Sequence, residues 1–284
     1  MIKVLIIGGD GQLGQCFKSI SSNWEKLELI FGDKIDCDIL DYAVLLKVFS
    51  LHKPDFVINC AAYTAVDMAE EEEKMARAIN ATGAGNVAKA CEAFNATLIH
   101  ISTDFVFEGN TPVLLNEEMA TTPISVYGQT KLEGEQMVAK SCEKYFIVRT
   151  SWLYSEFANN FMKTMLKLSE TRTDLGIISD QVGSPTYAVD LADAVLRIID
   201  SGNSNYGTYH YSNEGVISWY DFAHGIFELS EKAMVLNPLK TFEYPTKAKR
   251  PAWSAMDKTK IKMEFGLKIP YWSDSLALAL SRNK

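Results

Sequence analysis

Short, uninterrupted apolar runs recur along the chain and alternate with longer stretches of helical periodicity. Such runs are typical of parallel strands that are covered on both faces. The expected strands are residues 4–7, 27–31, 56–60, 98–102, 146–149 and 175–178. The expected helices are residues 12–19, 42–52, 72–94 and 131–141. Strands separated by helices predict an α/β fold with a doubly wound parallel sheet and right-handed crossovers.

The character of the chain changes near residue 180. Residues 180–186 contain glycine and proline and predict an irregular loop, which is followed by a helix over 189–200 and by short aromatic-rich segments. We therefore expect a sheet domain over residues 1–170 and a smaller α/β lobe formed mainly by residues 171–284. The lobe would close over the carboxyl edge of the sheet. The boundary is soft, because the two parts could exchange segments.

A glycine cluster follows the first expected strand and opens the first expected helix. Two residues separate Gly8 from Gly11, and two more separate Gly11 from Gly14. The pattern Gly9-x-Gly11-x-x-Gly14 is also present. In this context the pattern is the fingerprint of a Rossmann-type dinucleotide site. Glycines allow a tight turn and a close backbone approach, and the helix N-terminus directs its amides at the pyrophosphate.

The residues after the next strands predict the rest of the cofactor site. An acid is expected about 20 residues beyond the glycines, where it meets the adenosine ribose. Asp33 stands there and favours NAD, whereas the adjacent Lys34 tolerates the 2′-phosphate of NADP, so NADH and NADPH both stay open. Asp38-Ile39 is a plausible adenine contact, and residues 60–64 put small side chains where the nicotinamide half must pass.

Tyr127 and Lys131 are four residues apart and therefore share one face of a helix. A free tyrosine titrates near 10, so acid–base work at neutral pH requires a nearby cation such as Lys131 to favour the phenolate. Thr103 ends the fourth strand, at the edge of the sheet where ligands bind. Its hydroxyl could polarise a substrate carbonyl. Together these residues predict a nicotinamide-dependent oxidoreductase.

Composition narrows the class of protein. The chain has 284 residues, 47% hydrophobic and 23% charged, which is ordinary for a globular protein. A net charge of −8 argues against a nucleic-acid-binding surface. The five cysteines are scattered and the four histidines lack metal-ligand spacing, so we expect no metal site. The chain opens directly with a strand and contains no membrane-length apolar run, and we therefore expect a cytoplasmic protein.

These motifs together resemble the extended short-chain dehydrogenase/reductase superfamily and, within it, the dTDP-4-dehydrorhamnose reductase family. The resemblance runs through nearly the whole chain. Its segments are residues 8–14, 59–67, 102–107, 127–131, 149–154, 159–161, 180–186 and 250–251. Ala65-Val66-Asp67 and Ser151-Trp152 are the segments that are most specific to the family.

The resemblance implies reduction of the C4 ketone of dTDP-4-dehydro-L-rhamnose by NADPH or NADH, for cell-surface polysaccharide synthesis. It implies that Tyr127 is the proton donor, Lys131 its electrostatic helper and Thr103 the group that tunes the carbonyl. The implied cofactor contacts are Gly8, Gly11, Gln12, Leu13, Asp33, Asp38, Ile39, Ala62, Tyr63, Thr64, Tyr127 and Lys131. The implied substrate contacts are Val66, Thr103, Asp104 and Trp152, and Arg250 is a candidate for the diphosphate because guanidinium pairs well with phosphate oxygens.

The chain departs from the family pattern at a few positions. Some relatives dimerise around a divalent metal held by glutamates, but Gln15 and Asp190 stand at two of those places, which puts a metal-bridged dimer in doubt. A monomer and a homodimer both stay open. Phe105 replaces a common tyrosine, which removes a hydroxyl near the sugar and keeps the ring.

Alternative functions stay open beside the reductase. A nucleotide-sugar dehydratase usually has Asp-Glu after the strand-end threonine, and here Asp104-Phe105 lacks the second acid. A fucose-type epimerase–reductase needs a further cysteine, and the chain has none between Cys91 and Cys142. A non-catalytic homologue, such as the regulatory subunit of methionine adenosyltransferase, would not need the intact set of Thr103, Tyr127 and Lys131.

Overall fold

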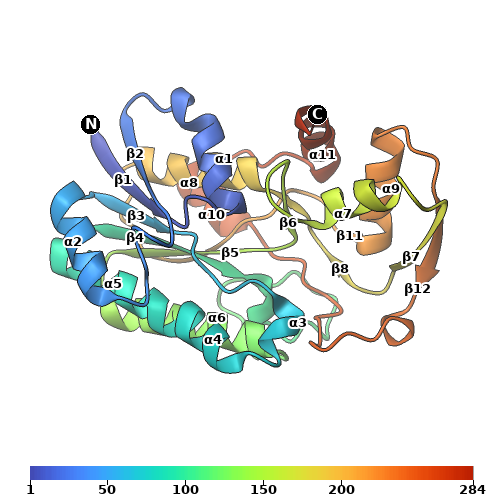
Figure 1. Ribbon diagram of the computed structural model, residues 1–284, viewed down its shortest axis with the longest axis horizontal. Helices are drawn as coiled ribbons and strands as arrows, with labels where there is room; N and C mark the ends of the chain where they lie inside the picture. Colours follow the sequence, from blue (N-terminus) through green and yellow to red (C-terminus); the bar gives the residue numbers. More distant parts are fainter. Residues whose placement is uncertain (284) are drawn as a thin grey trace.

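The computed structural model describes residues 1–283 and has a parallel sheet between two layers of helices (Figure 1). Within that range the main sheet has six strands. In spatial order they are β10 (Gly207–His210), β5 (Tyr145–Thr150), β4 (Thr97–Thr103), β3 (Phe56–Asn59), β1 (Ile2–Ile7) and β2 (Leu27–Gly32). All neighbouring pairs are parallel. The strand order reverses at β1, so the switch point where such sheets bind ligands lies between β1 and β3.

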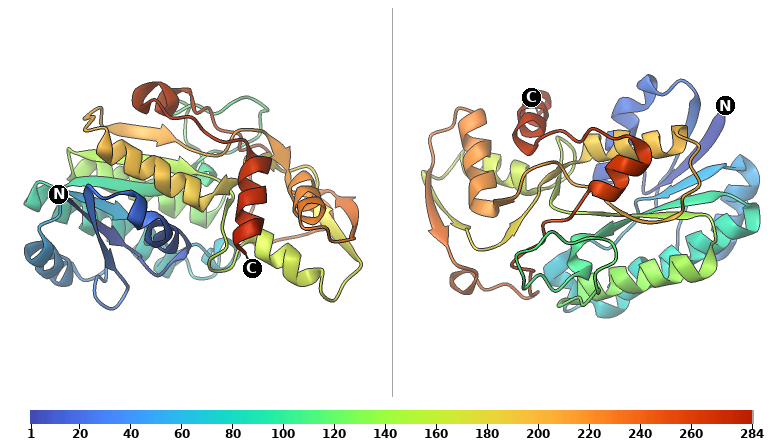
Figure 2. Two further views of the ribbon diagram at one scale, coloured as in Figure 1. Left: turned by 90° about the horizontal axis from the view of Figure 1, so that it is seen from above. Right: turned by 180° about the vertical axis from the view of Figure 1, so that it is seen from behind.

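Two layers of helices cover the faces of this sheet (Figures 1 and 2). One face carries α1 (Gln12–Ile20), α8 (Ala188–Asp200) and α10 (Thr259–Phe265). The other carries α2 (Tyr42–His52), α3 (Val66–Ala69), α4 (Glu73–Arg77), α5 (Ala84–Phe94) and α6 (Val126–Ser141). Separate apolar clusters fill the two layers, and fully buried Leu5 and Ile6 point to opposite sides. Alternate residues of one strand therefore supply both cores.

A smaller lobe extends beyond the carboxyl ends of the strands (Figure 1). Its helices are α7 (Phe161–Leu168), α9 (Trp219–Leu229) and α11 (Trp272–Arg282). Its strands are β7 (Asp174–Ile178) paired with β12 (Val235–Leu239), and β8 (Val182–Gly183) paired with β11 (Ile217–Ser218). A further short pair, β6 (Leu153–Tyr154) with β9 (Thr186–Tyr187), joins it to the sheet. The short 3₁₀ turns are η1 (Ser21–Asn23), η3 (Asp104–Val106) and η4 (Thr241–Glu243).

The α/β architecture expected from the periodicity is confirmed, but the sixth strand of the main sheet was assigned wrongly. The run at 175–178 forms β7, which pairs with β12 in the smaller lobe, and β10 takes the place beside β5. Apolar periodicity reports that a segment is extended, and it does not report which neighbour the strand will find. Residues 207–210 have too few aliphatic side chains to stand out as a buried strand.

Other element boundaries also differ from the expected ones. The helix predicted over 72–94 is divided by a π-helical segment, η2 (Ala78–Gly83). The helix predicted from 131 begins at Val126, because the Ser125 hydroxyl caps it. The loop expected at 180–186 contains the short strands β8 and β9. The proposed division at residue 170 stays a prediction; β10 and α8 lie beyond it in sequence and pack in the main sheet and its helical layer.

Candidate active site

The glycine turn between β1 and α1 has a backbone that side chains would obstruct. Gly8 has a φ of +83°, and a Cβ there would lie 2.9 Å from the backbone nitrogen of Ala61. A Cβ on Gly14 would lie 2.5 Å from the carbonyl oxygens of both Gly8 and Gly9. The turn is therefore as tight as a dinucleotide pyrophosphate requires, and α1 packs directly against it.

The first turn of α1 can receive an anion. It has no acidic residue, and the first amides of a helix lack intrahelical partners. The N–H of Gly11 donates to the Gly8 carbonyl oxygen (3.0 Å), which leaves the following amides of Gln12 and Leu13 at the helix start. The side chain of Gln12 donates to the Leu153 carbonyl oxygen at 3.2 Å. Backbone amides, rather than the Gln12 side chain, thus fit a pyrophosphate at this place.

The residues expected on the adenosine side lie just beyond β2. The amides of Gly8 and Gly9 both donate to the carbonyl oxygen of Gly32, so the following Asp33 lies next to the glycine turn. The Asp33 carboxylate accepts two backbone N–H groups of its own loop. Asp38 likewise caps its own turn, at 2.9 Å from the Leu40 nitrogen.

Ile39, expected on the adenine side, is a buried residue, and its contact with the cofactor stays a prediction. It is 5% exposed, and its side chain fills the space in front of Gly83, where a Cβ would come within 2.5 Å of Ile39. Ile39 therefore ties the loop after β2 to the start of α5. Its side chain contributes to the apolar cluster between the sheet and the layer that contains α5.

The segment expected beside the nicotinamide half follows β3 and is held by a residue that the sequence did not reveal. Asn80, 1% exposed, accepts the Tyr63 N–H at 2.8 Å and donates to the Thr130 hydroxyl at 3.1 Å. It therefore links the loop of Ala62, Tyr63 and Thr64 to α6. A lone asparagine inside an expected helix carries no signal of this role, which depends on the π-helical turn that points it inward.

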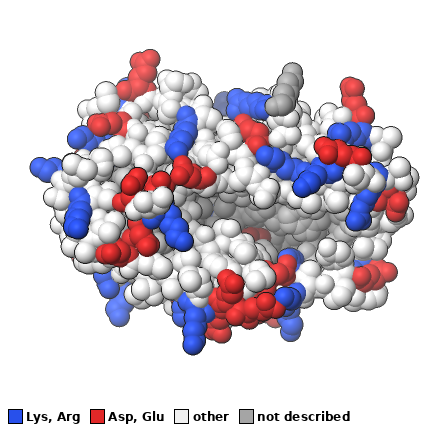
Figure 3. Space-filling model, viewed as in Figure 1, with Lys and Arg blue, Asp and Glu red and all other residues white. Residues whose placement is uncertain are grey.

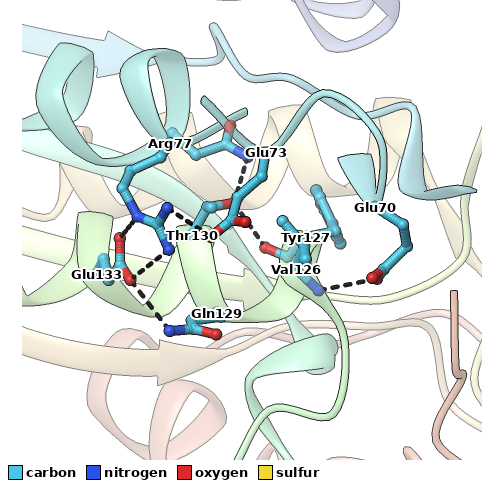
Figure 4. Close-up of polar contacts among 9 residues, drawn as sticks. Glu70, Glu73, Arg77, Val126, Tyr127, Gln129, Thr130 and Glu133 are labelled. Atoms are coloured by element: carbon cyan, nitrogen blue, oxygen red, sulfur yellow. Dashed lines mark hydrogen bonds and ion pairs between the residues drawn. The ribbon is translucent and has the colours of Figure 1, made fainter. Parts of the chain in front are cut away.

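The helix that carries Tyr127 starts against the end of β4. A Cβ on Gly128 would lie 2.2 Å from the carbonyl oxygen of Phe105, so only glycine allows this contact. The Phe105 and Tyr127 rings pack edge to face with centroids 5.5 Å apart. On the outer side, the Glu70 carboxylate accepts the Val126 N–H at 2.9 Å (Figure 4). Tyr127 is consequently fixed from both sides.

Tyr127 and Thr103 meet at this junction. Burial raises the pKa of Tyr127 to about 12; a hydrogen bond with the Thr103 side chain lowers it and the charge of Asp104 raises it. The Lys131 ammonium donates to the Ile101 carbonyl oxygen at 2.7 Å, and burial has the largest effect on the pKa of the phenol. The phenol is therefore protonated at neutral pH. Because a raised pKa also makes it a weaker acid, donation of its proton requires a group that stabilises the phenolate. That Lys131 favours the phenolate of Tyr127 stays a prediction.

Lys131 is 2% exposed on the face of α6 that packs on the sheet. Burial lowers its pKa to about 8, and the carboxylate of Glu135 is the main group that opposes this shift. The pKa of Lys131 is therefore only slightly above neutral pH. The charges of neighbouring groups consequently determine how much of the side chain is an ammonium.

Asp104 is 2% exposed and has an incompletely satisfied carboxyl group. Its Oδ1 accepts from the Thr103 hydroxyl at 3.1 Å, whereas its Oδ2 has no hydrogen-bond partner within residues 1–283. Burial raises the pKa of Asp104 to about 6, and the Ser254 and Thr103 side chains counter only part of that effect. A buried, poorly satisfied acid beside Thr103 is a typical feature of a functional site.

Trp152 lies near this acid but does not present both faces to solvent. Its indole stacks on Trp219 of α9, with centroids 3.7 Å apart and an interplanar angle of 10°. A Cβ on Gly183 would touch both the Trp152 ring (3.0 Å) and the Ser254 hydroxyl (2.6 Å), which connects the indole to the surroundings of Asp104. Trp152 also has a φ of +46°, a strained value for a bulky residue. Trp219 was not recognised from the sequence, because a tryptophan opening an amphipathic helix resembles a core residue.

A cleft of about 840 Å³ lies between the smaller lobe and the sheet part. The surface is hollowed in this region, and charges of both signs surround the hollow (Figure 3). Trp219 lines the cleft together with apolar residues of β7 and α7, and polar residues of α3 and of the loop after β12 complete it. This volume suits a nucleotide-sized ligand.

Arg250 lies at the cleft with an acid that the sequence did not assign. Its guanidinium forms a two-point ion pair with Asp67, at 2.7 and 3.1 Å, and Asp67 also accepts the Ala248 N–H at 3.1 Å. This pairing lowers the pKa of Asp67. Val66, half-buried, precedes Asp67 at the start of α3. The structure thus places Arg250 and Asp67 together in the lining of the cleft, and Val66 precedes Asp67 in the chain.

The described part of the chain has neither a cluster of metal-binding side chains nor a membrane-spanning helix. No group of three or more His, Cys, Asp or Glu side chains in residues 1–283 is arranged to hold a metal ion. No helix within that same range has both the length and the apolarity needed to cross a bilayer.

Known proteins match this chain in sequence over nearly its whole length. The family described as RmlD substrate binding domain matches residues 2–284. The chain is 43% identical to the dTDP-4-dehydrorhamnose reductase of Escherichia coli K12, covering 95% of this chain and 94% of that one. It is 38% identical to the enzyme of the same name from Aggregatibacter actinomycetemcomitans, over 97% of both chains.

A solved structure agrees with this result. The dTDP-4-dehydrorhamnose reductase of Bacillus anthracis, crystallised in complex with NADP, superposes with a TM-score of 0.95 at 40% identity, over 99% of this chain and 100% of that chain. The chain belongs to the RmlD substrate binding domain family, and the relatives to which it is compared above are named dTDP-4-dehydrorhamnose reductases.

Proposed function

We propose that this protein reduces the C4 ketone of dTDP-4-dehydro-L-rhamnose to dTDP-L-rhamnose, for the synthesis of cell-surface polysaccharide, with NADPH or NADH as reductant. One observation carries the proposal: Thr103, Tyr127 and Lys131 converge at the carboxyl end of β4, beside a glycine turn built for a dinucleotide. The named relatives support this reaction and this substrate. We place the activity in the cytoplasm, where reduced nicotinamides and nucleotide sugars are available.

The cofactor would lie across the switch point of the sheet. The amides of Gln12 and Leu13 would receive its pyrophosphate, and Asp33 and Asp38 would lie on the adenosine side. Residues 62–64 would border the nicotinamide half. When bound, the reduced nicotinamide supplies the hydride that C4 accepts.

The protein's own residues supply the proton and the orientation. The Thr103 hydroxyl would hydrogen-bond the ketone oxygen and polarise the C4–O bond. Tyr127, kept protonated by its burial, would donate its phenolic proton to that oxygen as negative charge develops there. The nearby ammonium of Lys131 would stabilise the resulting phenolate. Each of these groups belongs to one chain, so either a monomer or a homodimer would be competent.

The smaller lobe, formed mainly by residues 171–284, would bind the nucleotide sugar. Val66, Asp104 and Trp152 would surround the deoxysugar. The stacked partner of Trp152, Trp219, also lines the cleft, so sugar and nucleotide would occupy adjoining spaces. Arg250 would meet the diphosphate and would then exchange Asp67 for phosphate oxygens.

The test is oxidation of NADPH and of NADH by the wild-type protein, given a panel of nucleotide-linked 4-keto sugars. We expect turnover with dTDP-4-dehydro-L-rhamnose, and loss of turnover in Tyr127→Phe without loss of cofactor binding. Tyr206→Phe, at an exposed tyrosine on the surface, is the matched control. Cofactor binding with no turnover on any keto sugar would reject the reductase and favour the partner-binding alternative. Water elimination or epimerisation instead of reduction would favour the other superfamily chemistries.

A further inference from the structure

A buried ion pair lies directly behind the proposed catalytic lysine. Glu135 is one helical turn beyond Lys131 on the same inward face of α6 and is 5% exposed. Arg149 of β5, also 5% exposed, binds it in two places, Nη2 to Oε2 at 2.7 Å and Nε to Oε1 at 2.9 Å. A buried pair of this kind is often no more stable than apolar residues of the same volume, so stability alone does not account for it.

The pair is tied to the strand that carries Thr103. The Ser102 hydroxyl donates to Glu135 Oε1 at 2.6 Å, and the preceding residue, Ile101, accepts the Lys131 ammonium at 2.7 Å. Two adjacent residues of β4 are therefore bound by two residues of α6 that are one turn apart. These ties set the position of α6, and of Tyr127 at its start, relative to Thr103.

Among the groups around Lys131, Glu135 is the main one whose charge favours the ammonium form. On α6 the other group is Tyr127, which is uncharged at neutral pH. After β3 lies the thiol of Cys60, whose pKa is raised by burial, and on β4 lies His100, whose pKa is lowered by burial. Both are neutral in this environment, so neither offsets the cost of burying an ammonium.

The opposite side of the pair is arranged so that positive charge does not accumulate. Arg149 contacts His210 of β10 (Nη1 to Nε2, 3.4 Å) and lies over the Phe107 ring at 5.1 Å. Burial, aided by the charge of Arg149, lowers the pKa of His210 to about 3, so this histidine is neutral. His210 thus adds no positive charge next to Arg149, which is paired with Glu135.

We propose that Glu135 is a positioning residue for Lys131: it anchors the catalytic helix to β4 beside Thr103 and supplies the negative charge that keeps the lysine an ammonium. The inference rests on the proposed role of Lys131 in catalysis. It extends that role to three residues, Ser102, Glu135 and Arg149, that touch neither cofactor nor substrate.

The first measurement does not depend on activity. We would label lysine side chains with ¹⁵N, identify the Lys131 signal by its loss in Lys131→Met, and titrate it in the wild type and in Glu135→Gln. The amide can still accept from Ser102 but carries no charge. The titration midpoint of Lys131 should fall by about one pH unit, the lower end of the effect of an opposite charge, because Glu135 is also paired with Arg149.

The second measurement is the dependence of turnover on pH. In Glu135→Gln the basic limb of the kcat profile should move towards acid by a similar amount, while Glu135→Asp, which keeps the charge, should stay near the wild type. Glu133→Gln is the matched control, since Glu133 is on the same helix and also pairs with an arginine, Arg77 (2.8 Å), but on the outer surface (Figure 4). This control variant should change neither the titration midpoint of Lys131 nor the basic limb of the kcat profile.

Folding failure and failure of the proposed function can each be recognised. If Glu135→Gln does not fold because Arg149 is left unpaired, the double variant Glu135→Gln/Arg149→Met removes both charges together. The repulsion between Arg149 and Lys131 is then lost as well, so the Lys131 midpoint should fall in the same direction but by less. An unshifted Lys131 midpoint in either folded variant would overturn the inference. A wild type that reduces no keto sugar would instead reject the proposed function, and the NMR titration would still decide the role of Glu135.

Discussion

The ionised carboxylate of Asp104 should lower the free energy of unfolding at neutral pH. The variant Asp104→Asn tests this expectation directly. Burial raises the pKa of this carboxyl from 3.8 to about 6. A group whose pKa is raised on folding stabilises the native state below its unfolded pKa, and that contribution is lost as pH rises through the folded value. The wild-type free energy of unfolding should therefore fall between about pH 4 and pH 7. Two pKa units correspond to a loss of about 3 kcal/mol.

Asparagine has nearly the same shape and does not ionise. Its amide oxygen can accept from Thr103, and its amino group takes the place of the unpartnered Oδ2 next to Ser254. At pH 8 the variant should be more stable than the wild type by up to about 3 kcal/mol, a rise in Tm of about 6–12 °C for a chain of this size. At pH 4 the two proteins should be nearly equal. Activity should fall, because the acid beside Thr103 is lost.

The assay is urea unfolding of both proteins at several values between pH 4 and pH 8. Asp257→Asn is a control of opposite sign: hydrogen bonds from Thr259 lower the pKa of Asp257, so its stabilising contribution is present above the unfolded pKa and is lost towards acid. That variant should therefore lose stability at pH 8. A stability difference for Asp104→Asn that does not change with pH, or a variant weaker than the wild type at pH 8, would refute the reasoning.

Three further outcomes are expected. Gly14→Ala should abolish NADPH binding in a fluorescence titration and cost about 1–3 kcal/mol of stability, since its Cβ would lie 2.5 Å from two backbone oxygens; normal binding would contradict the tight turn. Tyr127→Phe should lower kcat by about 10²–10⁴ while the Kd for NADPH stays unchanged, and near-normal kcat would remove it as proton donor. Arg250→Lys should raise KM for the nucleotide sugar by about tenfold or more with a smaller change in kcat, because lysine cannot reproduce the two-point contact; an unchanged KM would place the diphosphate elsewhere.

Local pattern was enough to predict the parts of the fold and the chemistry that depend on neighbours in sequence. The glycine spacing after a strand led to the dinucleotide turn, and the four-residue spacing of Tyr127 and Lys131 placed both on one helix. Parallel strands alternating with helices led to the doubly wound sheet. Each of these inferences uses a repeat or a spacing that the backbone geometry converts directly into position.

Contacts between distant segments could not be predicted in this way. The choice of β10 over β7 as the sixth strand, the pairing of Arg250 with Asp67, and the stacking of Trp152 on Trp219 all join residues more than sixty positions apart or in different layers. The raised pKa values of Tyr127 and Asp104 come from burial, which exists only once the chain has packed. Residue types and spacings thus named the proposed catalytic groups, whereas three-dimensional packing set their partners, their solvation and their protonation, because those depend on which surfaces meet.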